Sequence, residues 1–208
     1  MEKSMCITYF VENSLYVNIT NRCSNRCDFC IRNNGDGAYG SESLWLEREP
    51  TEEEIFSSVI SHDLSKIDEL VFCGYGEPSY RLAEARAVSL RLKENYPKLK
   101  IRINTNGQSD LILGFSSASL YKDAFDTVSI SLNSPSAEEY DRICHSKFGP
   151  QAFSAILKFT SEVKKYVPDT RLSVVSEFIS LSDIEKCRCL ADELGVTLRV
   201  RDYIPPET

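Results

Sequence analysis

A regular alternation of short apolar runs with longer segments of helical spacing is the feature that most constrains the fold of this sequence. The runs are rich in Val, Ile, Leu and Phe, which is typical of strands. The segments between them place apolar residues three or four positions apart, which is typical of helices. Such alternation favours a parallel sheet with right-handed crossovers. We expect strands over residues 7–11, 15–20, 69–73, 100–104, 127–132, 171–178 and 196–200.

Helix start signals lie between these runs. Thr51-Glu-Glu-Glu54 has the pattern of a capping box, in which the Thr and Glu side chains each accept a backbone hydrogen bond. Similar boxes start at Ser136 and Ser182, and Gly195 is placed to end the last helix. We expect helices over residues 51–62, 81–95, 151–166 and 182–194, one from 136, and one or two short helices within 109–124.

The expected elements form six strand-then-helix units, of which the last lacks its helix. Because three residues separate 7–11 from 15–20, these two runs resemble a hairpin. The length of 208 residues fits one domain over residues 1–208. Six strands do not close an eight-stranded barrel. We therefore expect a single-domain α/β fold with an N-terminal hairpin, whose functional residues lie at the C-terminal ends of the strands.

Three cysteines lie within eight residues directly after the 15–20 strand. Cys23, Cys27 and Cys30 are separated by three and then two residues. Soft thiolates select zinc, copper or iron–sulfur clusters, whereas an odd number of closely spaced thiols fits a disulfide poorly. A structural zinc site and a cubane cluster each normally take four protein ligands. The residues alone therefore leave open a zinc ion completed by a distant ligand and a cluster with one uncapped iron.

Charge and composition restrict the partners of the protein. The net charge of −7, from 24 basic and 31 acidic residues, argues against non-specific nucleic-acid binding. No apolar run approaches the ~20 residues that span a membrane, and residues 1–10 lack the pattern of a signal peptide. We therefore expect a cytoplasmic protein with reduced thiols, in which eight cysteines favour metal chemistry over disulfides.

The cysteine spacing, with Phe29 just before the third cysteine, resembles the signature of the radical S-adenosylmethionine (radical SAM) enzymes. This resemblance implies a partial (β/α)6 barrel and a [4Fe-4S] cluster held by Cys23, Cys27 and Cys30, with SAM on the fourth iron. In that family an electron from the cluster cleaves SAM to methionine and a 5′-deoxyadenosyl radical, which abstracts hydrogen from a substrate. Phe29 would stack on the adenine, or else pack locally.

A second resemblance follows the 69–73 strand. Gly74, Tyr75, Gly76 and Glu77, followed by a proline, are similar to the "GGEP" element of the family. The resemblance implies that this segment holds the methionine amino group of SAM through backbone oxygens and Glu77. An ordinary strand-to-helix turn is the alternative.

Further SAM contacts are expected at the next two strand ends. The stretch that starts at Asn104 resembles the Asp/Asn-Thr-Asn-Gly element of the family, which implies that Asn104 contacts the ribose hydroxyls. A polar turn is the alternative there. Ser131 and Asn133 lie where relatives place a polar or basic SAM ligand.

Several charged and aromatic residues carry weaker expectations. Arginines that flank the cysteines could balance an anionic cluster or substrate, or could simply line a solvated loop. A polar, aromatic segment after the cysteines and residues of the last two strands are candidates to face the substrate. These residues are Arg22, Arg26 and Arg32, then Trp45, Glu47 and Arg48, and finally Glu177, Arg199 and Arg201.

Over nearly all of its length the chain resembles the small radical SAM family described as TatD-associated. The likeness is carried by residues 18–33, 44–50 and 72–78. It implies an unknown substrate, a reducing electron donor such as flavodoxin or ferredoxin, and a functional link to a TatD-family metal-dependent hydrolase. The alternatives are a glycyl-radical-enzyme activase, a 7-carboxy-7-deazaguanine synthase, and a protein that binds a cluster or zinc without chemistry.

Overall fold

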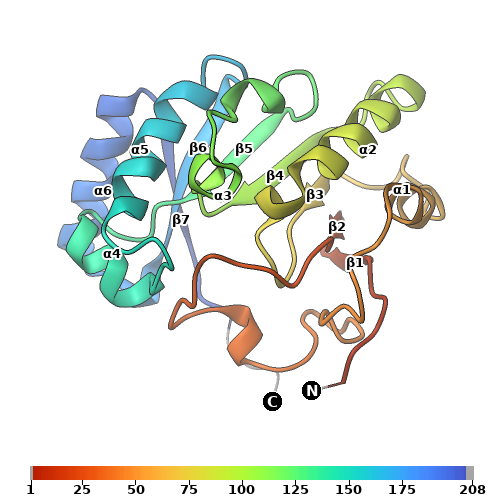
Figure 1. Ribbon diagram of the computed structural model, residues 1–208, viewed down its shortest axis with the longest axis horizontal. Helices are drawn as coiled ribbons and strands as arrows, with labels where there is room; N and C mark the ends of the chain where they lie inside the picture. The colour runs from red at the N-terminus through yellow and green to blue at the C-terminus, as the bar shows by residue number, and fades with distance from the viewer. Residues whose placement is uncertain (1, 205–208) are drawn as a thin grey trace.

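In the computed structural model, which describes residues 2–204, seven strands form one open sheet in chain order (Figure 1). The first two strands are antiparallel, and each later strand is parallel to its neighbour. The expected hairpin and the expected parallel units are therefore confirmed. The strands are β1 (Thr8–Val11), β2 (Ser14–Val17), β3 (Leu70–Phe72), β4 (Ile101–Thr105), β5 (Thr127–Ser131), β6 (Asp169–Val175) and β7 (Thr197–Arg201).

The helices follow the strands as the alternation predicts. The box at Thr51 is complete, because the Thr51 side chain accepts from the Glu54 N–H and the Glu54 side chain accepts from the Thr51 N–H. The α-helices are α1 (Glu52–Ile60), α2 (Leu82–Asn95), α3 (Ser109–Leu113), α4 (Ala137–Cys144), α5 (Gln151–Val163) and α6 (Leu181–Leu194). Short 3-10 turns are η1 (Ile31–Asn33), η2 (Pro78–Arg81), η3 (Ala118–Tyr121) and η4 (Ser176–Phe178). None of the helices within residues 2–204 is long and apolar enough to cross a membrane.

Two boundaries differ from expectation at the same place. Strand β6 ends at Val175 because residues 176–178 form the turn η4, so Glu177 lies in this turn and not on the strand. Helix α6 is capped by Ser180, whose Oγ accepts from the Asp183 N–H at 3.1 Å, and not by Ser182. Ser180 has the extended backbone of an N-cap, while Ser182 is already inside the first turn.

The main core lies between the sheet and the helices. Alternate strand residues such as Ile101, Ile103, Val128 and Ile130 are fully buried there, which follows from the two-residue period of a strand. At roughly 25 cal/mol per Å² of buried apolar surface, this layer is the main source of stability. Because these residues point toward the helices, the residues between them on each strand point to the opposite face of the sheet.

We call that opposite face of the sheet the inner face, and it has two halves. Over β1–β3, residues of the loop after β2 pack on the sheet in a second buried cluster built around Tyr9, Ala38, Leu44 and Tyr75. Over β4–β7, the alternate residues that do not enter the core are polar, except Val175 at the end of β6. They include Asn104, Ser129, Ser131, Arg171, Ser173, Arg199 and Arg201.

Candidate functional site

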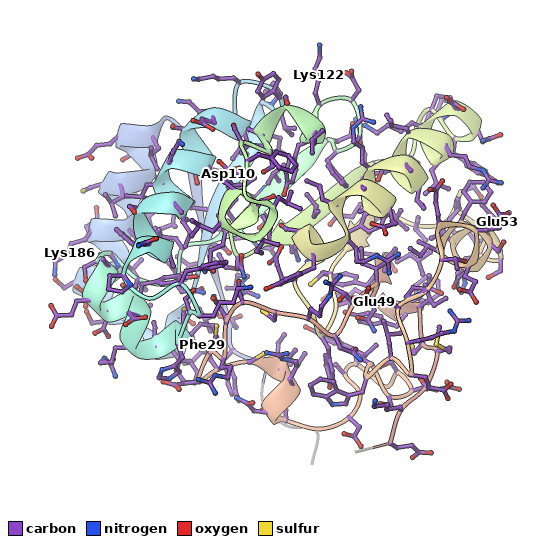
Figure 2. The ribbon with its side chains drawn as sticks, in the orientation of Figure 1. Phe29, Glu49, Glu53, Asp110, Lys122 and Lys186 are labelled. Atoms are coloured by element: carbon purple, nitrogen blue, oxygen red, sulfur yellow. The ribbon has the colours of Figure 1, made fainter. Side chains whose placement is uncertain are left out.

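The cysteine loop follows β2 and is fastened to the end of α4. The Arg26 N–H donates to the Cys144 carbonyl at 3.0 Å, and the Asp28 N–H donates to the Ile143 carbonyl at 3.0 Å. In Figure 2 the labelled Phe29 lies next to the lower end of α4, where this loop passes. A segment more than a hundred residues further along the chain therefore holds the loop in place.

A buried polar network supports the loop from below. Asn25 Nδ2 and Gln108 Nε2 donate to the Tyr140 hydroxyl at 2.8 and 2.9 Å, and Gln108 Nε2 also donates to Asn25 Oδ1 at 2.9 Å. Asn106 Nδ2 donates to Ser24 Oγ at 2.7 Å. Buried polar groups that are fully paired define one geometry. The network therefore fixes the loop relative to the C-terminal end of β4.

The three thiols of the loop are all partly exposed and unbridged. The Cys30 N–H donates to the Cys27 carbonyl at 3.1 Å, which turns the chain tightly between these two residues. The Cys23 sulfur accepts from the Asn25 N–H at 3.4 Å, and the Cys30 sulfur accepts from Arg32 Nε at 3.4 Å. The three thiols are soft donors on an open loop, and two of them already accept hydrogen bonds. Such thiols suit a metal or cluster that is bound through sulfur.

The pKa values of two of these thiols lie above the usual range. Burial raises the pKa of Cys23 to about 12, with a smaller contribution from the nearby charge of Glu77. The hydrogen bond with Cys144 and burial both raise the pKa of Cys27. Since a metal binds the thiolate, metal binding here must displace the protons from these groups.

The residue types of the loop suit an iron–sulfur cluster. Within residues 2–204 no three His, Cys, Asp or Glu side chains are grouped as they would be around one ion. Thiolates are the usual protein ligands of a cubane, which binds each of them through a separate iron. By its chemistry, the donor set of Cys23, Cys27 and Cys30 fits three irons of a [4Fe-4S] cluster.

The segment after β3 lies against the segment after β2. A Cβ at Gly74 would clash with the Asn18 side chain, and a Cβ at Gly76 would clash with the Thr20 carbonyl. The Tyr75 N–H donates to Asn18 Oδ1 at 3.3 Å. Glycine is therefore required at Gly76 because the backbone of Thr20 approaches closely, and at Gly74 because the buried Asn18 side chain fills the space of a Cβ. The motif alone does not reveal either reason.

Glu77 is held inside the protein. Its Oε1 accepts from the Ser79 N–H at 2.9 Å, Ser79 Oγ at 2.6 Å and Thr105 Oγ1 at 2.8 Å, and its Oε2 accepts from the Asn106 N–H at 2.6 Å. Burial raises the pKa of the Glu77 carboxyl, although these hydrogen bonds act in the opposite direction. The structure thus places Glu77 as a link between the ends of β3 and β4, and its expected contact with SAM stays a prediction.

Asn104 and Ser131 lie on the inner face, and Asn133 follows at the end of β5. Asn104 Oδ1 accepts from Arg102 Nη1 at 2.9 Å. Asn133 is in a left-handed conformation with φ of 57°, and its buried Oδ1 has no hydrogen-bond partner among the described residues. A buried acceptor without a partner is uncommon in native proteins. A ligand that donates a hydrogen bond, such as an amine or hydroxyl of SAM, would complete this site.

Phe29 belongs to an aromatic row. Its ring centroid lies 5.2 Å from that of Phe178, which lies 5.2 Å from that of Tyr203. The Tyr203 hydroxyl and Asn34 Oδ1 are 3.1 Å apart, so the row joins the cysteine loop to the segment after β7. The local packing alternative for Phe29 is therefore supported by these ring contacts, and its stacking on adenine stays a prediction.

The weaker candidates separate into two groups. Arg22 pairs with Glu49 at 2.8 Å, and both Nη atoms of Arg48 bind Glu54 at 2.8 and 2.5 Å, so these two arginines have partners away from the thiols. Arg32 alone among the loop arginines contacts a thiol in the described structure. The polar partners Asn25, Gln108 and Tyr140 have no sequence signal of their own, because each is recognised only through distant contacts.

Two cavities lie at the other end of the sheet. One of about 720 Å³ lies between residues 62–68 and 96–100, and one of about 580 Å³ is lined by residues such as Glu69, Asp126 and Asp169. Both are at the N-terminal ends of the strands, away from the cysteine loop. We place the functional site at the C-terminal ends, because the thiols and the unpaired Asn133 oxygen are there.

An open, mostly parallel α/β sheet with a three-cysteine loop after its first parallel strand defines a cluster-binding half-barrel. The Radical SAM superfamily model matches residues 17–186, and the chain belongs to this superfamily. Members of the superfamily use a [4Fe-4S] cluster and SAM. No curated protein sequence matches the chain.

Solved structures show the same fold. A radical SAM methyltransferase from Sphaerobacter thermophilus matches with a TM-score of 0.69 and 15% identity, over 97% of this chain and 60% of that one. Streptococcus suis SuiB bound to S-adenosylmethionine gives 0.58 and 15%, over 94% and 39%. The maturase HydG from Carboxydothermus hydrogenoformans gives 0.62 and 17%, over 92% and 44%. The chain thus spans 60% or less of these proteins, and identities this low show the fold alone.

Proposed function

We propose that this protein is a radical SAM enzyme that acts on a substrate bound at the inner face of its sheet. The observation that carries the proposal is the cysteine loop itself, with Cys23, Cys27 and Cys30 held at the C-terminal edge by the hydrogen bonds to α4. These thiols would hold a [4Fe-4S] cluster. When bound, the cluster and SAM supply an electron and a 5′-deoxyadenosyl radical that abstracts hydrogen from substrate.

The residues of the chain bind and orient. The backbone of residues 74–77 would receive the methionine end of SAM, and Glu77 keeps that backbone in place through its bonds to β4. Asn104 and Ser131 offer polar groups on the inner face, and the unpaired Asn133 oxygen offers an acceptor. The protein thereby contributes orientation, electrostatics and the exclusion of water, while the cofactors carry the chemistry.

The test compares cluster-dependent SAM cleavage in matched cysteine variants. The protein is reconstituted anaerobically with iron and sulfide, reduced, and given SAM, and 5′-deoxyadenosine is quantified. We expect cleavage in the wild type and in Cys189→Ala, because Cys189 is exposed on α6. We expect its loss in Cys27→Ala. A brown, reduced wild type that makes no 5′-deoxyadenosine would identify a binding protein without chemistry, and cleavage by Cys27→Ala would refute the ligand assignment.

We propose the TatD-associated group as the subfamily. The segment 44–50, which carries much of that resemblance, is fastened to the region of the cysteines. Asn18 Nδ2 donates to the Leu44 carbonyl at 2.8 Å, and Asn21 both accepts from the Leu46 N–H at 2.9 Å and donates to its carbonyl at 2.7 Å. This supports a role of the segment beside the cluster. Deuterium transfer into 5′-deoxyadenosine from deuterated cell extract would show that the extract contains a substrate.

The expected partners stay proposals as well. A flavodoxin or ferredoxin in the cytoplasm would supply the electron, and a TatD-family hydrolase would act in the same process. Replacing the chemical reductant by reduced flavodoxin or ferredoxin in the same assay tests the first point. Isothermal titration of the reconstituted protein with a purified TatD-family hydrolase tests whether the functional link includes direct binding.

A further inference from the structure

The polar half of the inner face carries arginines on its last two strands. Leu198 of β7 packs against the core on the helix side of the sheet. Because strand side chains alternate between the two faces, Arg199 and Arg201 point to the inner face. The sheet register sets Arg199 beside Ser173 and Arg201 beside Val175. Ser173 in turn lies beside Ser131 of β5, so Arg199 shares a row with one of the residues expected at SAM.

The arginines of this face differ in charge balance. Arg102, whose side chain is only 7% exposed, is neutralised by Glu69 through contacts of 2.6 and 3.0 Å. Arg171 pairs with Asp169 at 2.6 Å. Neither Arg199 nor Arg201 forms an ion pair with any residue that the structure describes. Within residues 2–204 the positive charge on β7 therefore has no ion-pair partner, in a chain whose net charge is −7.

Two of these guanidinium groups also keep an unused donor. The Nε atoms of Arg171 and Arg201 are buried and have no hydrogen-bond partner within residues 2–204. A buried donor that lacks a hydrogen bond loses its hydration without compensation, so native proteins rarely leave one without a ligand or water. The residues beside Arg199 and Arg201 on β6 are Ser173 and Val175, which cannot neutralise a guanidinium.

The charge of Arg201 acts on groups in other segments of the chain. Burial raises the pKa of Tyr39 to about 12, and the Arg201 guanidinium acts against this rise. It also acts against the rise that burial causes in the pKa of Cys73, the residue directly after β3. Arg201 is therefore within electrostatic reach of the loop after β2 and of the end of β3, where residues 74–77 begin.

We infer that Arg199 and Arg201, with the free Nε of Arg171, form a site for an anionic group of the substrate, a carboxylate or a phosphate. A guanidinium matches both groups with paired N–H donors, and such charge-assisted bonds are about twice as strong as neutral ones. The inference rests on the proposed function, since it names the substrate class of that enzyme. SAM carries its own carboxylate, but its expected contacts are at the ends of β3–β5, whereas these two arginines are on β7.

The experiment measures anion binding to the reconstituted protein saturated with SAM. Sodium pyrophosphate and sodium succinate are titrated separately at low ionic strength by isothermal titration calorimetry. We expect saturable binding of at least one probe, and preference for pyrophosphate or succinate tells a phosphate from a carboxylate site. Arg201→Gln and Arg199→Gln should each weaken binding by about tenfold, and Arg201→Lys should recover part of it because the charge returns without the paired donors.

Arg188→Gln is the matched control, since Arg188 is exposed on α6 and pairs with Glu185. SAM affinity and SAM cleavage are measured on the same samples. The inference fails if the wild type binds neither probe saturably, or if the β7 variants bind the probes as the wild type does. It also fails if Arg201→Gln loses SAM affinity by the same factor, because the arginine then serves the cofactor carboxylate.

The outcomes separate this inference from the proposed function. Wild-type protein that cleaves SAM but shows no arginine-dependent anion binding refutes the substrate class alone. If wild-type protein binds the anion through these arginines but forms no 5′-deoxyadenosine, the proposed enzymatic function is refuted and the anion site is still supported. If Arg201→Gln does not fold or does not take up the cluster, Arg199→Gln and Arg201→Lys decide by the same criteria.

Discussion

The guanidinium of Arg32 lies beside the sulfur of Cys30, with Nε 3.4 Å from Sγ. Its other end is fixed, because Nη2 donates to the Asn25 carbonyl at 3.1 Å and the guanidinium carbon lies 5.7 Å from the centre of the Trp45 ring. Although burial disfavours the charged form, the nearby thiol sulfurs, Cys30 first, raise the pKa of Arg32. A positive charge is therefore held permanently next to a predicted cluster ligand.

This contact should set the reduction potential of the cluster. Hydrogen bonds and positive charge at the cysteine sulfurs favour the reduced, more negative state. Arg32→Met should lower the midpoint potential by about 59 mV, which corresponds to about a tenfold change for one electron. An anaerobic redox titration followed by electron paramagnetic resonance measures it. Arg22→Met is the control, since Arg22 pairs with Glu49 instead. Equal potentials for Arg32→Met and wild type would show that the contact has no electrostatic role.

The close approach behind Gly76 predicts a steric cost. A Cβ there meets the backbone of Thr20 and Arg22, which cannot move away as a flexible side chain can. Gly76→Ala should lower the free energy of unfolding by about 1–3 kcal/mol, the usual cost of overpacking. Gly35→Ala is the control, because its Cβ would meet nothing nearer than 3.8 Å. Denaturant unfolding followed by circular dichroism compares them, and equal losses would mean that the segments do not touch.

The hydrogen bonds of Glu77 predict a loss of stability with a different cause. All four hydrogen bonds at its carboxyl are donated to it, by Ser79, Thr105 and Asn106. Glu77→Gln replaces one acceptor oxygen by an NH2 group that faces donors, so we expect a loss of about 1–3 kcal/mol in the free energy of unfolding. The exposed Glu138→Gln on α4 should change it by less than about 0.5 kcal/mol. A stable Glu77→Gln that had lost SAM binding would instead assign Glu77 to the cofactor.

The sequence predicts what local patterns encode and misses what long-range contacts encode. The two-residue and 3.6-residue periods located every strand and the larger helices, and the cysteine spacing located the loop. The predicted N-cap of α6, Ser182, was wrong. Ser180 and Ser182 are each followed three residues later by an acidic residue, so the local pattern fits both. Only the position of the turn η4 shows that the helix starts after Ser180.

The contacts that hold the site together cannot be predicted from local sequence patterns. Tyr140 binds Asn25 across 115 positions, and Gln108 binds Asn25 across 83 positions. No periodicity or spacing rule connects such residues. The motif after β3 likewise predicts where Glu77 lies in the chain, but the direction of its carboxyl depends on β4, which the motif does not contain.

The ion pair at the start of α1 predicts a pH dependence. Hydrogen bonds from Arg48 and from the Thr51 N–H lower the pKa of Glu54 to about 2. Because the folded-state pKa is below the unfolded value, this stability is present above the ordinary Glu pKa and is lost as the pH falls toward 2. Glu54→Gln keeps the capping box but removes the charge, so it should be less stable than wild type at pH 6 and equal to it near pH 2.

Glu52→Gln in the same turn controls for helix-dipole effects. Unfolding midpoints from pH 2 to 7 measure the difference, and a gap between Glu54→Gln and wild type that persists to pH 2 would rule out the carboxylate as its source.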